Sequence, residues 1–144
     1  MISEKAAKQD LLKEGGGASN FFVWLKGRAQ SFVHAGRGFF LLCLSQWNFR
    51  IHLVAAVGAT CLGWYFRIAA IEWLVLVVTI TLVLTAEALN TALERTVDIV
   101  KASRHPIARD AKDLAAAGVL IASFGSLAVG LIMFGPRLLR LFMG

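Results

Sequence analysis

The chain contains 144 residues, of which 58% are hydrophobic and only 17% charged, and its mean hydropathy is +0.68. An average soluble domain is roughly 45–50% apolar and about 25% charged, so this chain has too few polar side chains to cover a water-exposed surface. Its hydrophobicity also excludes intrinsic disorder, and its length allows one domain. Composition therefore excludes a water-soluble enzyme and indicates a small integral membrane protein.

The net charge of +6 would suggest a nucleic-acid partner in a soluble protein, but here the basic residues flank apolar runs. Residues 51–86 contain only Arg67 and Glu72 as charged residues, and residues 114–136 contain none. Anionic lipid headgroups and the orientation of basic loops toward the cytoplasm explain this distribution better. We therefore expect a membrane lipid partner and no nucleic acid.

The first 20 residues are polar and are expected to form a flexible extension, with Gly15 to Gly17 as a joint. Residues 21–44 mix large apolar side chains with basic ones such as Arg28, which is too much charge for a membrane span. This mixture predicts an amphipathic helix in the membrane interface, and a helix packed on the bundle is the alternative. Residues 21–144 are expected to form a single membrane domain.

Three membrane-spanning helices are expected, at about residues 47–66, 68–100 and 111–134. The first is slightly short for a hydrocarbon core, which needs about 20 apolar residues, and Arg67 after it predicts a very short turn. The second contains neither Pro nor Gly, and the third is expected to end at Gly135-Pro136. The expected fold class is an all-α membrane protein with three transmembrane helices and an N-terminal interfacial helix.

Basic residues also predict the orientation. Residues 1–50 contain seven Lys or Arg and residues 95–112 contain five, whereas the turn between the first two spans contains one. Both basic regions lie on the same side after two crossings, so the N-terminus and the loop after the second span are expected in the cytoplasm.

A polar run, EALNTALERTVD, occupies residues 87–98 of the second span. On a helix with 3.6 residues per turn, four of its polar side chains fall within about 80° of one another. These are Glu87, Asn90, Glu94 and Asp98. At about 1.5 Å per residue, Glu87 lies about 22 Å beyond Glu72, near the inner edge of the hydrocarbon. A carboxylate at that depth is costly, so the segment is predicted to be functional.

Stacked acids repel one another unless a cation lies among them, so this face favours a divalent metal. Oxygen ligands at a membrane–water boundary suit Mg²⁺ that arrives with nucleotide phosphates. The structural alternative is a set of salt bridges to Arg95, Lys112 or Arg50. A small proton-coupled transporter that uses Glu87 is the alternative from another functional class, and a structural helper subunit would need no intramembrane acid.

The third span begins near Lys112 and Asp113, after Pro106, which suits the opening of a helix. Lys112 could contact phosphate oxygens or reach a lipid headgroup, and the nearby acidic face favours phosphate. The sequence contains no GxxxxGK[ST] loop and no protein-kinase signature, so a phosphoryl transfer here would use another architecture.

These motifs resemble those of the small bacterial integral-membrane lipid kinases, the prokaryotic diacylglycerol kinases and related undecaprenol kinases. The resemblance rests on four segments and covers about residues 21–134. The segments are SFxxAxRG (31–38), NFRIHLVAA (48–56), ExLNTAxExxVD (87–98), and HP followed by AKDxAAAxVLIAS (105–123). It implies an ATP-dependent lipid kinase of the bacterial cytoplasmic (inner) membrane that assembles as a homotrimer, with Mg²⁺ as cofactor.

The resemblance also implies roles for single residues. Glu87 matches the proposed catalytic base, which also contacts the lipid substrate, and Glu94 matches the metal-binding glutamate. Four residues match the ATP site together with Glu94. The four are Asn90, Asp98, Lys112 and Asp113. Apart from the resemblance, Arg28 is a candidate for lipid binding, with anchoring of the interfacial helix as the alternative.

In one position the chain departs from the family. The second metal-binding carboxylate often precedes the Phe of NFR by three positions, and here that position is Gln46. An amide oxygen can coordinate Mg²⁺ but supplies no charge, so a second ion is expected to be held less tightly.

The acceptor expected from the sequence is diacylglycerol, which would give phosphatidic acid. The alternative is undecaprenol, which would give undecaprenyl phosphate. The NFRIHL segment and the Glu72-Trp73 pair look more like the undecaprenol kinases, but they lie away from the reacting centre.

Overall fold

The structure is a computed structural model that describes residues 2–99 and 105–143, with side chains from Asn20 onward except that of Phe22. The described residues form four helices, α1 (Ile2–Ser45), α2 (Trp47–Tyr65), α3 (Ala70–Ile99) and α4 (Pro106–Met143). The chain divides into two compact units, Met1–Leu41 and Leu42–Gly144. The all-α fold expected from the sequence is confirmed.

The first unit consists of most of α1. This helix begins at Ile2, not near residue 21 as predicted, and Gly15 to Gly17 do not interrupt it. A glycine costs about 1 kcal/mol relative to alanine in a helix but does not break it, and the Ala, Leu, Lys and Glu residues before the glycines are strong helix formers. The flexibility of the first 20 residues and the interfacial location of α1 stay predictions.

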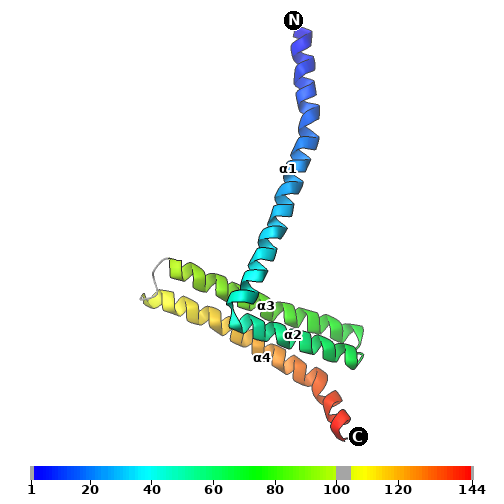
Figure 1. Ribbon diagram of the computed structural model, residues 1–144, viewed down its shortest axis with the longest axis vertical. Helices are drawn as coiled ribbons and strands as arrows, with labels where there is room; N and C mark the ends of the chain where they lie inside the picture. The colour runs from blue at the N-terminus through cyan, green and yellow to red at the C-terminus, as the bar shows by residue number, and fades with distance from the viewer. Residues whose placement is uncertain (1, 100–104, 144) are drawn as a thin grey trace. The chain divides into compact units, whose positions relative to one another are not determined.

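The second unit contains α2, α3 and α4, which run side by side (Figure 1). α3 packs against both α2 and α4, and its contact with α4 is the more extensive. α2 ends one residue before its predicted end, and α3 begins two residues after its predicted start. The predicted end of this span at residue 100 and most of the following loop lie outside the described residues.

The turn between α2 and α3 is short, as predicted from the position of Arg67 between two apolar runs. Arg67 has a φ of 48°, in the left-handed region that a non-glycine residue seldom adopts. The backbone N–H of Ile68 donates to the carbonyl of Gly63 and that of Arg67 to the carbonyl of Trp64, both at 3.2 Å. These two bonds form a Schellman motif, which satisfies carbonyls at the end of α2 and reverses the chain.

Two of these helices are long enough and apolar enough to cross a membrane by themselves. Within the described residues these are α3 and α4, and a third span results only if residues 23–65 are counted as one span broken at Gln46. α2 has 19 residues and includes Arg50 and His52, which lower its hydropathy. Two to three candidate spans are therefore present, and the count of three stays a prediction.

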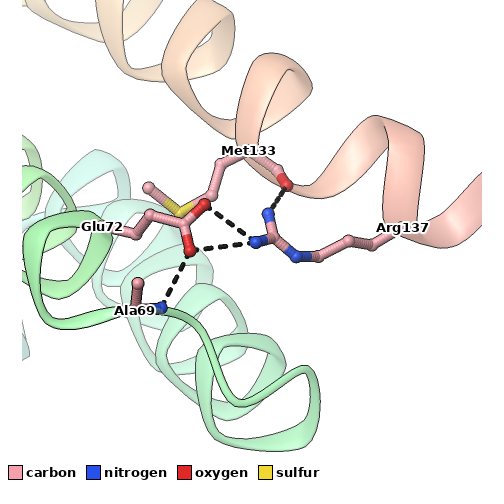
Figure 2. Close-up of polar contacts among 4 residues, drawn as sticks. All are labelled: Ala69, Glu72, Met133 and Arg137. Atoms are coloured by element: carbon pink, nitrogen blue, oxygen red, sulfur yellow. Dashed lines mark hydrogen bonds and ion pairs between the residues drawn. The ribbon is translucent and has the colours of Figure 1, made fainter.

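The predicted end of the last helix at Gly135-Pro136 is wrong, because α4 continues through Pro136 to Met143. Proline removes a backbone donor inside a helix, and α4 bends in this region (Figure 1). Beside it, Arg137 donates from Nη1 to the carbonyl of Met133, one turn earlier. Its Nη2 lies 2.9 Å from both carboxylate oxygens of Glu72 (Figure 2).

Glu72 also accepts a hydrogen bond of 2.9 Å from the backbone N–H of Ala69, at the start of α3 (Figure 2). One carboxylate thus caps α3 and holds α4 through Arg137. The buried core beside this ion pair consists of Ile68, Leu76, Met133 and Phe134. The ion pair and this core fix the α2–α3 turn against the far part of α4.

Gly63 is required by this packing. A Cβ at Gly63 would lie 3.0 Å from the indole of Trp73 and 3.1 Å from Cδ1 of Ile68, whereas a Cβ at Gly58 on the same helix would meet nothing within 4 Å. We expect Gly63→Leu to destabilise the protein by about 1–3 kcal/mol, because overpacking forces neighbours apart. Gly58→Leu, with the same gain in helix propensity, should not lower the melting temperature in detergent. Equal melting temperatures for the two variants would contradict the close approach.

Candidate active site

The site lies on the face of α3 that is turned into the bundle. Leu76 and Val83 are buried on this face, and Glu87, Asn90 and Thr91 follow them. Their spacings of seven, four and three residues place them on one side of a helix. The buried face therefore changes from apolar to polar at Glu87, as the sequence predicted from the position of the acids.

Glu87 is almost completely buried, with 2% of its surface exposed. Burying a carboxylate is costly unless a charge or a hydrogen bond compensates for the lost water. Among the described residues, His52 on α2 and Glu94, two helical turns further along α3, lie within electrostatic range of Glu87. A buried acid at the polar end of an apolar helix face makes this position the candidate functional site.

Asn90 has an unsatisfied oxygen beside this acid. Its Nδ2 donates to Oε1 of Glu94 at 3.3 Å, and its side chain is 8% exposed. Within the described part of the chain, its Oδ1 is buried without a hydrogen-bond partner. Because nearly all buried polar atoms have a partner, this oxygen is suited to accept from a ligand or to coordinate a cation.

The residues predicted to hold a metal lie on neighbouring segments. Arg95 donates from Nη2 to Oγ of Ser45 at 2.8 Å, and these two residues adjoin Glu94 and Gln46. Gln46 precedes α2 in an extended conformation, and its side chain makes no capping hydrogen bond to that helix. The hydrogen bond between Arg95 and Ser45 therefore joins the two chain segments that carry the predicted metal ligands Glu94 and Gln46.

No group of three or more His, Cys, Asp or Glu residues that could hold a metal ion occurs in residues 2–99 and 105–143 as described. Mg²⁺ usually takes one or two carboxylates from a protein and completes its shell with phosphate oxygens and water. Glu94, the amide oxygens of Asn90 and Gln46, and ATP phosphates fit that donor set.

The more exposed residues of the predicted site form ion pairs, one of them within the site. Nζ of Lys112 on α4 lies 2.6 Å from Oδ1 of Asp98 on α3. Asp113 pairs loosely with Arg109, at 3.9 Å, on the surface of α4. One of the salt bridges considered as a structural alternative, Lys112 to the acidic face, is therefore present. The Lys112–Asp98 ion pair also places Lys112 beside the polar end of α3, where Lys112 was expected to contact phosphate oxygens.

Arg28 lies in the first unit, where its guanidinium stacks over the ring of Trp24 at 5.2 Å. Its contact with a lipid stays a prediction. The sequence motifs assign no role to His52, but it is half-buried on α2 and lies within electrostatic range of Glu87. Only the packing of α2 against α3 reveals this, because the two residues are 35 positions apart.

The fold and the site together define an all-helical membrane protein with a buried carboxylate and an unsatisfied amide oxygen at the polar end of the buried face of α3. A sequence model of the family described as "Prokaryotic diacylglycerol kinase" matches residues 33–134. The chain belongs to this family and is an ATP-dependent lipid kinase.

Individual relatives carry two different names. The chain is 38% identical to an undecaprenol kinase of Bacillus subtilis over 109 residues, which cover 76% of this chain and 89% of that protein. It is 40% identical to a diacylglycerol kinase of Synechocystis over 112 residues, 77% of this chain and 64% of the relative. It is 33% identical to the diacylglycerol kinase of Escherichia coli over 79 residues, which cover 55% of this chain and 65% of that protein.

Proposed function

We propose that this chain transfers the γ-phosphate of ATP to the hydroxyl group of a membrane lipid at the cytoplasmic face of the inner membrane. The observation that carries the proposal is the buried Glu87 at the boundary between the apolar and polar parts of α3. A base at this boundary can meet a lipid hydroxyl, which cannot leave the interface, while ATP arrives from water.

In the proposed reaction, the lipid oxygen attacks the γ-phosphorus and its proton passes to the Glu87 carboxylate. The bond from the γ-phosphorus to the β–γ bridging oxygen breaks, and ADP leaves. Phosphoryl transfer depends mainly on positioning and on charge neutralisation, which Lys112 and Arg95 can supply near the phosphates. Bound Mg²⁺ would add charge neutralisation, and Glu94 with Asn90 and Gln46 would hold it.

Asp98 and Asp113 are proposed to line the nucleotide site with Lys112. Arg28 is proposed to help hold the lipid. We further propose that the protein works as a homotrimer, as implied by its family resemblance, with its N-terminus in the cytoplasm. The basic residues before α2 and after α3 support this orientation.

Undecaprenol is the acceptor that we propose first, because the B. subtilis undecaprenol kinase aligns over 89% of its own length. This reverses the preference drawn from the sequence alone. Diacylglycerol is the second candidate, and it is favoured by the 40% identity to the Synechocystis diacylglycerol kinase. Both acceptors present a primary hydroxyl to the same base.

The test uses purified full-length protein in detergent with Mg²⁺ and labelled ATP, with undecaprenol and diacylglycerol in parallel reactions. Label in undecaprenyl phosphate alone is the expected result, and label in phosphatidic acid alone would make diacylglycerol the acceptor. Absence of labelled lipid in both reactions would reject the proposed function.

The doubtful metal ligand Gln46 can be tested in the same assay. We expect Gln46→Glu to lower the Mg²⁺ concentration needed for half-maximal activity, because a carboxylate adds a negative charge to the metal site. Gln30→Glu, an exposed position on α1, adds the same charge elsewhere and should leave the Mg²⁺ requirement unchanged. An unchanged or higher requirement for Gln46→Glu would remove Gln46 from the metal shell.

A further inference from the structure

An apolar groove of about 350 Å³ lies among α2, α3 and α4. Small side chains on α2, including Ala56 and Ala59, and Gly130 on α4 leave this space open. Among the described residues that line it, His52 is the only ionisable one, and it lies at one end. A groove with this lining holds water poorly, so an apolar occupant is favoured.

The groove has the depth of one membrane leaflet. Along α2 it extends from His52 to Leu62, which is about 15 Å at 1.5 Å per residue. The hydrocarbon core of a bilayer is about 30 Å thick, so half of it is also about 15 Å. The groove can therefore accommodate a chain that runs from an interface to the bilayer centre.

The end marked by His52 adjoins the site. Val83, which lines the groove, precedes Glu87 by four residues, so the two side chains lie on the same face of α3 one helical turn apart. His52 lines this end of the groove and lies within electrostatic range of Glu87. A lipid whose hydroxyl meets Glu87 would have its chain directed along this groove.

We propose that the groove holds the hydrocarbon chain of the lipid acceptor, and that His52 contacts the hydroxyl-bearing end of that lipid beside Glu87. This inference rests on the proposed lipid kinase function and names where its acceptor binds. The imidazole N–H of His52 donates a hydrogen bond to the acceptor oxygen, while the hydroxyl donates to the Glu87 carboxylate. The apolar walls select a lipid alcohol over a water-soluble one.

Two glycines of α4 offer a matched test of the chain-binding part. A Cβ at Gly130, in the groove, or at Gly125, outside it, would meet nothing within 4 Å. Gly130→Leu should fill the groove, and Gly125→Leu should change helix propensity equally without filling it. The ion pairs between α3 and α4 set the register of these two antiparallel helices. In this register Gly130 lies about seven residues of α4, or about 10 Å, from the level of Glu87 toward the Glu72–Arg137 end.

The experiment measures kcat and KM for Mg-ATP and for pairs of long and truncated acceptors. Undecaprenol is paired with its short analogue geraniol, and dioleoylglycerol is paired with dibutyrylglycerol. The parent protein must first phosphorylate one long acceptor, which tests the function separately. Gly130→Leu should raise the KM for that acceptor roughly tenfold, with little change for its truncated form or for Mg-ATP. His52→Gln should raise the KM for both the long and the truncated acceptor. Gly125→Leu should leave all of these KM values unchanged.

Chemical crosslinking of the same variants in detergent tests the rival occupant, a second copy of the chain. Loss of the crosslinked oligomer in Gly130→Leu, with an unchanged KM for the long acceptor, would assign the groove to a subunit interface and overturn the proposal. An equal rise in KM for long and truncated acceptors in Gly130→Leu would also overturn it. Ala59→Leu fills the groove from α2 and should repeat the Gly130→Leu result.

Discussion

Glu87→Gln is expected to lower kcat by roughly 10²–10⁴-fold and to leave the binding of Mg-ATP nearly unchanged. General-base catalysis contributes about this factor, and an amide keeps the shape of the side chain but cannot accept the hydroxyl proton. Glu87 is also buried, so an uncharged replacement is not expected to weaken the fold. The measurements are lipid-kinase kinetics, the binding of an ATP analogue, and the melting temperature in detergent.

Glu72→Gln is the matched control, because it makes the same substitution on the same helix. Glu72 holds Arg137 and caps α3, so its loss should lower the melting temperature and leave kcat largely intact. The opposite pattern is expected for Glu87→Gln. Retained turnover in Glu87→Gln would mean that another group accepts the proton, and His52, which interacts with Glu87, would be the first residue to examine.

The parts of this fold that sequence predicted well depend on local properties of the chain. α2 begins at Trp47 as predicted, and the turn at Arg67 lies where two apolar runs meet. The inward face of α3 followed from helical spacing, and Glu87 and Asn90 are buried on that face. Run length, helical period and the cost of burying charge are sufficient for such predictions.

Features that depend on contacts between distant residues could not be predicted in this way. Pro136 suggested a helix end, but α4 continues to Met143, and beyond the proline Arg137 binds both a carbonyl of its own helix and Glu72, 65 residues away. The environment of His52 likewise depends on how α2 packs against α3. Salt bridges from Arg95, Lys112 or Arg50 to the acidic face were the structural alternative from the sequence, and the structure contains one of them, between Lys112 and Asp98.

Glu94→Gln is expected to weaken Mg-ATP rather than to remove the base. Glu94 accepts from Nδ2 of Asn90 at 3.3 Å, and Oδ1 of the same amide is buried without a hydrogen-bond partner among the described residues. Losing the negative charge should raise the KM for Mg-ATP by roughly tenfold or more, since even residues one shell outside a metal cost 10–100-fold in affinity. The KM for the lipid should change little.

Asp110→Asn is the matched control, because Asp110 is an exposed carboxylate on α4 outside the proposed site, and its effect on Mg-ATP should be smaller. A Mg²⁺ titration at fixed ATP separates the two variants, and a rise in the lipid KM alone for Glu94→Gln would place Glu94 at the acceptor and not at the nucleotide.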